Sequence, residues 1–298
     1  MDARAILLGL GFAVMWSSAF TSAKLIVADA PPLWALALRF LISGLLAIGI
    51  ARALGQSWQL TRAQWRLTIL FGLCQNALYL GLNFVAMKTV PAGLASIIAS
   101  SMPLLVAFAG WVAMGERLGR VAVAGLVAGF AGVSLIMGTR ISGGVDLFGL
   151  SLCLMGVVAL AVATLSVRGA ASGGNVLMVV GLQMLVGSAI LAAVAAATEP
   201  LVFDPTPRLA LAFAYTTLVP GLAATLVWFM LVRRIGPVRA ATFHFLNPFL
   251  GVAIASLMLG ERIGPLDIVG VAIIMAGILA VQLSRAPAAP RAVRRSTV

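Results

Sequence analysis

The chain has 298 residues, of which 62% are hydrophobic and 9% are charged, and its formal net charge is +12. A soluble domain of this length could not bury so much apolar surface, so the composition excludes a water-soluble globular fold. The positive charge is compatible with a nucleic-acid partner, but its distribution along the chain, described below, favours a membrane protein without one.

Ten apolar stretches follow one another along the chain, each long enough to cross the hydrocarbon core of a bilayer. Backbone polar groups in lipid must be satisfied within each segment, so we expect an all-α integral membrane protein with ten transmembrane helices. The short linkers leave no room for a soluble domain. The helices are expected at residues 5–27, 33–54, 66–86, 92–113, 118–138, 147–167, 175–197, 209–231, 238–259 and 265–284.

The first span carries a polar stripe, because Ser17, Thr21 and Lys24 follow one another at helical spacing. Trp16 lies beside this stripe and is too deep for an interfacial belt, so it is a candidate wall of a substrate cavity. The span also has features of a secretory signal, with Arg4 before the apolar run. Processing there would remove one span from a balanced pair of five-helix units, so we expect the span to be retained.

Two basic residues, Lys24 and Arg39, lie near the outer ends of the first two spans and flank Asp29. Long cationic side chains in such places either snorkel to the membrane interface or pair with a carboxylate. We expect this structural role for both.

The third span places Gln75, Tyr79 and Asn83 on one face, because they recur every four residues. An amide, a phenol and a second amide offer hydrogen-bond donors and acceptors to a polar solute, so these three are candidate substrate-binding residues. The alternative is hydrogen bonding between helices, which also uses Asn and Gln in membranes.

A repeat becomes visible at the fourth span. The segment 103–117, PLLVAFAGWVAMGER, recurs as 248–262, PFLGVAIASLMLGER, displaced by 145 residues. We therefore expect two units, 1–138 and 139–298, and two units of five spans each must be inverted relative to one another. Glu116 and Glu261 of the repeated Gly-Glu-Arg triplet are expected to complement helix dipoles.

Pro103 and Pro248 occupy equivalent depths in the fourth and ninth spans. A proline inside a helix removes a backbone hydrogen bond and bends the helix, so both are candidate gating kinks around a site at the midplane. Permanent bends with no role in gating are the alternative.

The eighth and ninth spans add further candidates. His244, the chain's one histidine, lies one turn before Asn247 and could bind a substrate carboxylate or take part in a proton step. A neutral imidazole hydrogen-bonded within the bundle is the alternative. Phe243 could stack on an aromatic substrate, and Trp228 is a further candidate wall residue.

Several signals are absent from the sequence. There is no phosphate-binding G-x-x-x-x-G-K-[ST] motif, no catalytic nucleophile with partner residues, and no acidic residue deep in a span. Cys74 and Cys153 lie inside predicted spans and indicate neither a disulfide framework nor a metal site. We therefore expect no cofactor and no metal, and we expect that the protein is not an enzyme.

Charge sets the expected orientation. With the N-terminus in the cytoplasm, cytoplasmic segments carry 14 basic residues and the opposite side carries 4, namely Lys88, Arg140, Arg208 and Arg262. This bias follows the positive-inside rule and predicts that both termini are cytoplasmic.

The motifs together resemble a known superfamily. They are Trp16-Ser17-Ser18-Ala19-Phe20, Leu38-Arg39-Phe40, Ala86-Met87-Lys88 and the duplicated segment from proline to Gly-Glu-Arg. The chain resembles a ten-helix drug/metabolite transporter built from two EamA-type repeats, and among these it is similar to exporters of amino acids, including aromatic ones. The resemblance implies alternating access through a central cavity lined by the first, third, fourth, sixth, eighth and ninth spans.

We therefore expect an exporter of amino acids in the bacterial cytoplasmic membrane, with the lipid bilayer and a small solute as its partners and no nucleic acid. Export of drugs or other metabolites is the alternative within the same class. A membrane-embedded enzyme acting on lipid is the alternative from another class, and the sequence offers no nucleophile or metal site for it.

Overall fold

The computed structural model describes residues 2–166 and 175–285. This part of the chain is helical, with no strand, and contains ten helical spans long and apolar enough to cross a membrane. The prediction of ten transmembrane helices is thereby confirmed. Four basic residues counted for the orientation, Arg168, Arg291, Arg294 and Arg295, lie outside the described residues.

Six spans are single helices and four are built from consecutive pieces. The single helices are α1 (Ala3–Asp29), α2 (Pro32–Ala53), α7 (Arg120–Ser142), α8 (Leu147–Ser166), α9 (Val176–Thr198) and α14 (Pro265–Arg285). The third span joins α3 (Arg62–Phe71), the π-helix η1 (Gly72–Leu80) and α4 (Gly81–Ala86), and the fourth joins α5 (Ala92–Ser100) and α6 (Met102–Met114). The eighth joins α10 (Pro207–Thr216), the π-helix η2 (Thr217–Ala223) and α11 (Ala224–Ile235), and the ninth joins α12 (Pro237–Ala241), the 3₁₀-helix η3 (Thr242–Leu246) and α13 (Asn247–Leu259).

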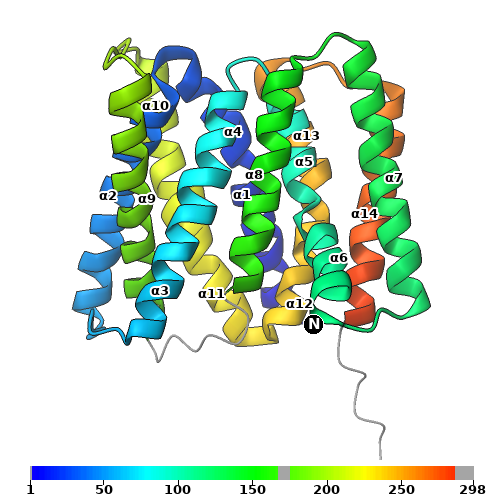
Figure 1. The fold of residues 1–298 in the computed structure, drawn as a ribbon, viewed down its shortest axis with the longest axis horizontal. Coiled ribbons are helices and arrows are strands. Elements are labelled where there is room, and N and C mark those ends of the chain that lie inside the picture. Colours follow the sequence, from blue (N-terminus) through cyan, green and yellow to red (C-terminus); the bar gives the residue numbers. More distant parts are fainter. Residues whose placement is uncertain (1, 167–174, 286–298) are drawn as a thin grey trace, which may run out of the picture.

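The two halves repeat the same element boundaries. Elements α10, η2, α13 and α14 each begin 145 residues after α3, η1, α6 and α7, which is the offset of the sequence repeat. Gly115 and Gly260 end α6 and α13 with φ angles of 67° and 68°, a left-handed conformation that glycine adopts without a steric penalty. These two ends lie at opposite sides of the bundle (Figure 1), so the repeats are inverted as predicted. The division between residues 138 and 139 stays a prediction.

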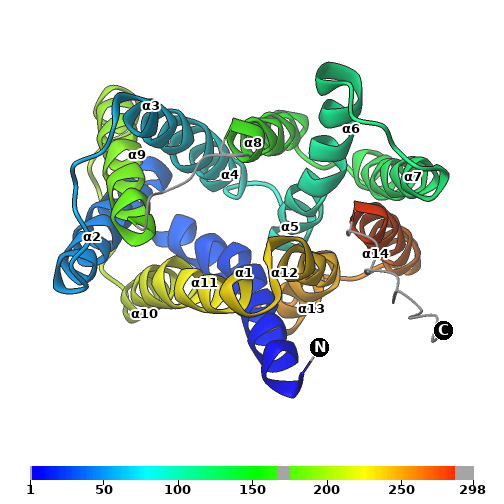
Figure 2. The ribbon, with the colours of Figure 1, turned by 90° about the horizontal axis from the view of Figure 1, so that it is seen from below.

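Equivalent helices of the two halves pair at both ends of the long axis. Helices α2 and α9 pack at one end and α7 and α14 at the other, with the remaining spans between them (Figure 2). Glycines allow the backbones to approach closely, since a Cβ atom on Gly277 would lie 2.6 Å from the carbonyl oxygen of Gly125. The glycines of the fifth and tenth spans therefore bring the backbones of α7 and α14 into close contact.

The two prolines mark breaks in their spans. Pro103 lies in the first turn of α6, directly after the break at Ser101, and Pro248 lies in the first turn of α13, directly after η3. The first turn of a helix tolerates proline because its N–H has no partner there in any case. Both spans are thus discontinuous at equivalent depths, whereas their role as gates stays a prediction.

Candidate functional site

A small cavity lies between spans of the two halves. Its walls come from the first, second, third and eighth spans. The lining residues are Trp16, Ala19, Phe20, Ala23, Arg39, Gln75, Tyr79, Leu80, Asn83, Phe84, Met87, Thr216 and Pro220. The cavity volume of about 60 Å³ has room for only a few water molecules, since each occupies about 30 Å³ in the liquid. A solute as large as an aromatic amino acid does not fit in this conformation unless the walls move apart.

Two π-helical segments at equivalent places in the halves form opposite parts of the wall. Segment η1 provides Gln75 and Tyr79, and η2 provides Pro220, which cannot donate a backbone hydrogen bond. A π-helix is rare and occurs mostly as a local bulge at functional sites. Nothing in the sequence of the third span signals one, because it contains no proline and its polar residues follow ordinary helical spacing.

Four of the seven expected substrate-binding residues line this cavity: Trp16, Gln75, Tyr79 and Asn83. Among the described residues, the side chains of Gln75 and Tyr79 make no hydrogen bond to other protein groups. Asn83 donates from Nδ2 to the carbonyl oxygen of Tyr79 at 2.8 Å, and its buried Oδ1 has no partner. These polar atoms therefore do not join helices together. Asn76, in contrast, donates to the carbonyl oxygen of Gln183 at 2.9 Å and does tie two spans.

His244 and Trp228 lie next to the cavity rather than in its wall. The His244 ring packs against Phe12, Trp16 and Trp228, with ring centroids 5.2, 6.2 and 5.2 Å away. Its Nδ1 lies 3.0 Å from Nδ2 of Asn247. Because an amide nitrogen only donates, this contact makes Nδ1 an acceptor and places the proton of the neutral ring on Nε2. Trp16 thus links the cavity to the histidine.

Phe243 lies elsewhere. Its ring packs on Gly9 of α1, where a Cβ atom would lie 2.3 Å from the ring, and it belongs to a cluster with Ala5, Leu231 and Ala240. It is not among the residues that line the cavity.

Lys24 takes a structural role as expected, whereas Arg39 neither reaches the membrane interface nor pairs with a carboxylate. Lys24 Nζ donates to the carbonyl oxygens of Met87 and Val90, at 2.6 and 3.1 Å, and so satisfies the end of the third span. Arg39 is only 6% exposed and lines the cavity. Neither pairs with Asp29, which instead accepts from Nε of Arg208 at 2.9 Å. The signal for Arg39 was present in the sequence, since a charged residue inside a span normally faces a cavity or a partner.

The comparisons with known proteins agree with this architecture. The model of the EamA-like transporter family matches residues 3–138 and 147–283. The chain belongs to this family.

Relatives of this EamA-like transporter cover nearly its whole length. The uncharacterized transporter YvbV of Bacillus subtilis is 28% identical over 83% of this chain and 81% of its own. A probable amino-acid metabolite efflux pump of Salmonella typhimurium is 27% identical over 91% of this chain and 92% of its own. A solved crystal structure covers 95% of this chain and 98% of its own with a TM-score of 0.68, and its 22% identity makes this a likeness of fold. The protein is thus a multi-pass membrane transporter.

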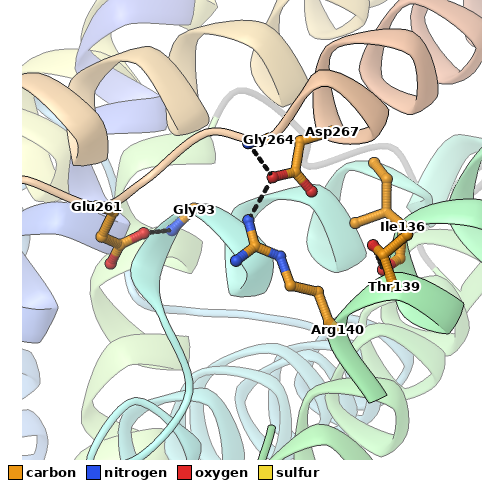
Figure 3. Close-up of polar contacts among 7 residues, drawn as sticks. All are labelled: Gly93, Ile136, Thr139, Arg140, Glu261, Gly264 and Asp267. Carbon is orange, nitrogen blue, oxygen red and sulfur yellow. Dashed lines mark hydrogen bonds and ion pairs between the residues drawn. The ribbon is translucent and has the colours of Figure 1, made fainter. Parts of the chain in front are cut away.

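Polar contacts join helices of this transporter at the end of the bundle opposite the start of α1 and the end of α14. Glu261 reaches across to the start of α5, where its Oε2 accepts from the Gly93 amide at 2.9 Å (Figure 3). Its Oε1 accepts from the neighbouring Ala92 amide at 2.6 Å. Nearby, Arg140 pairs with Asp267 at 2.7 Å and ties α7 to α14. The carboxylate of Glu261 therefore complements the dipole of a helix from the other half of the chain.

A matching contact ties the opposite flank at the same end. Oε2 of Glu199 accepts hydrogen bonds from the backbone amides of Leu33 and Trp34, at 3.0 and 3.2 Å, and so joins α9 to the start of α2. In the described part of the chain, no group of three or more His, Cys, Asp or Glu residues could hold a metal ion.

Proposed function

We propose that the protein exports amino acids, including aromatic ones, from the cytoplasm by alternating access through the cavity described above. The observation that carries this proposal is the cavity between the halves, whose aromatic walls surround the side chains of Gln75 and Tyr79, which make no hydrogen bond to another group in residues 2–166 and 175–285. Export of drugs or other small metabolites is the alternative within the same cavity.

A polar group in the membrane interior without a hydrogen bond is unfavourable, so such groups normally face water or a solute. Gln75 and Tyr79 offer donors and acceptors, while Trp16, Phe20 and Phe84 offer apolar faces. This combination suits a small solute that has both a polar and an aromatic part.

Alternating access requires that one end closes while the other opens. The contacts of Glu261 and Lys24 hold the end opposite the termini closed. The breaks at Pro103 and Pro248 divide the two spans that would have to bend, and we assign them the role of gates. In the proposed cycle these contacts separate as those at the other end form.

The distribution of charge and the names of relatives support the proposed orientation and location. The excess of basic residues at the end that carries the termini favours a cytoplasmic position for that end, in the bacterial inner membrane. The closed end then faces outward, and the cargo would enter the cavity from the cytoplasm. The name of the Salmonella relative, an efflux pump for amino-acid metabolites, supports the direction and the class of cargo.

His244 offers a route for proton coupling. A doubly protonated imidazole donates from both nitrogens, so protonation would break its contact with the amide of Asn247 and force that side chain to turn. Because Asn247 also accepts from Ser17 of α1 at 3.4 Å, its rotation would alter the contact between the first and ninth spans.

Flux into proteoliposomes tests the function. Purified protein would be reconstituted and offered a panel of labelled amino acids, with and without a pH gradient. We expect uptake above that of empty liposomes, and no uptake of any amino acid would contradict the proposal. An uptake rate that is the same with and without the pH gradient would contradict proton coupling. Tyr79→Ala and His244→Ala should each reduce flux while membrane insertion remains normal, and unchanged flux in both would place the path elsewhere.

A further inference from the structure

Arg39 is a cation buried inside the membrane-spanning bundle. It is the eighth residue of α2, so its Cα lies about 10 Å along the helix axis from the first residue, at 1.5 Å per residue. Its side chain turns inward to the cavity wall and leaves the residue only 6% exposed. This depth and direction are unlike those of a basic residue that anchors a helix end.

No acidic side chain in the described part of the chain pairs with this cation. The chain has eight acidic residues, all within the described part, and no ion pair of Arg39 with any of them is recorded there. Its Nε is buried without a hydrogen-bond partner, and the recorded contact of the guanidinium is with the ring of Phe40, 5.2 Å from its centroid. An unpaired charge at such a place is costly and has to be compensated by something else.

The backbone opposite leaves room for the guanidinium. A Cβ atom on Gly221 of η2 would lie 3.4 Å from Nη2 of Arg39 and 3.6 Å from Oγ of Ser43, a hydroxyl that also lacks a partner. The cation therefore lies between α2 and η2, beside Thr216 and Pro220 in the same wall. Both elements would move relative to each other if the cavity widened.

We infer that Arg39 binds the carboxylate group of the transported solute. A guanidinium donates two parallel hydrogen bonds to a carboxylate, and the pair is strong where water is excluded. The other lining groups then recognise the remainder of the solute, with Gln75 and Tyr79 for polar atoms and Trp16 for an aromatic side chain. This inference rests on the proposed function and narrows the cargo to solutes that carry a carboxylate.

Competition for binding of labelled phenylalanine to the purified, reconstituted protein tests the inference. The competitors are phenylalanine, phenylalaninamide, which lacks the carboxylate charge, and 3-phenylpropionate, which keeps the carboxylate and lacks the amino group. For the wild type we expect phenylalaninamide to need a concentration at least about tenfold higher than phenylalanine, the size expected for a charge-assisted hydrogen bond. We expect 3-phenylpropionate to compete.

Variants assign the effect to this residue. Arg39→Gln should reduce the preference for phenylalanine over its amide to less than about threefold, and Arg39→Lys should keep part of it because a charge remains. Arg140→Gln, whose guanidinium pairs with Asp267 away from the cavity, is the matched control and should keep the full preference. If Arg39→Gln does not fold, the wild-type and Arg39→Lys results decide.

The outcomes separate the two proposals. Equal competition by the amide and the acid in the wild type, or a preference that survives in Arg39→Gln, overturns the role of Arg39 while flux of amino acids still supports the export function. Absence of binding and flux for every amino acid overturns the export function itself.

Discussion

Replacement of Glu261 by glutamine should open the end of the bundle opposite the termini. The carboxylate accepts two backbone hydrogen bonds at the start of α5, at 2.6 and 2.9 Å. Glutamine has the same shape but one acceptor oxygen and no charge. A hydrogen bond to a charged group contributes about 1.5–3 kcal/mol net, and the loss of one such bond would change the equilibrium between closed and open states by about 10- to 150-fold.

The assay follows the accessibility of a cavity residue. Ala23 lines the cavity and is buried, so a cysteine placed there (Ala23→Cys) reacts with a membrane-impermeant maleimide only when the closed end opens. The native residues Cys74 and Cys153 are buried, and their background is measured in the protein without the added cysteine. We expect Glu261→Gln to increase the labelling rate from that side by about 10- to 150-fold, as long as the open state stays a minority.

Glu199→Gln is the control for this prediction. It removes the same kind of contact at the same end, but between α9 and α2, which pack together as one flank. Its labelling rate should stay near that of the parent. Equal increases in both variants would show a general loosening of the bundle, and no increase with Glu261→Gln would refute its role in closing this end.

Three further predictions concern packing, the cavity and pH. Gly277→Leu should destabilise the α7–α14 pair by about 1–3 kcal/mol through overpacking, which would lower the melting temperature in detergent. Gly138→Ala, where an added Cβ atom meets open space, should leave the melting temperature unchanged. Equal melting temperatures of the two variants would contradict this prediction. Tyr79→Phe removes a hydroxyl that has no hydrogen-bond partner among the described residues, so the stability of the protein should not change. The amino-acid concentration that half-saturates transport should increase about two- to tenfold. A loss of stability with unchanged transport would show that the hydroxyl stabilises the fold and does not bind the solute. The hydrogen bond from Arg234 lowers the pKa of Asp2 from 3.8 to about 2. The contact of Asp2 with Arg234 of α11 should therefore persist above pH 4 and be lost as the pH falls toward 2. Hydrogen exchange at the start of α1 should accelerate in that pH range in the wild type but not in Asp2→Asn.

The ten spans and the inverted repeat could be predicted from the sequence because both depend on patterns along the chain. Hydrocarbon thickness fixes the length of a span, and the segment 103–117 recurs at 145 residues in the sequence and again in the boundaries of the helices. Tyr79 and Asn83 were found because polar residues inside an apolar span are few. Their spacing placed them on one face.

The rotation of each helix about its own axis was harder to predict. In α2, lipid-facing and protein-facing positions are both apolar, so the pattern does not indicate which side meets the cavity. The inward turn of Arg39 depends on the space left by Gly221, a residue 182 positions later in the chain. The π-helix that carries Tyr79 has no local signal either, since the third span contains no proline. For the same reason Phe243 packs on Gly9 and lies outside the cavity wall.

Exchange of amino acids across the membrane tests the central claim most directly. Proteoliposomes loaded with unlabelled phenylalanine would be placed in a low concentration of labelled phenylalanine. A carrier that alternates its access returns with cargo from either side, so the account predicts transient accumulation of label that depends on internal phenylalanine and is strongly reduced in Tyr79→Ala. Label entry that is independent of internal amino acid, or equally fast in Tyr79→Ala, would contradict the claim that amino acids cross by alternating access through this cavity.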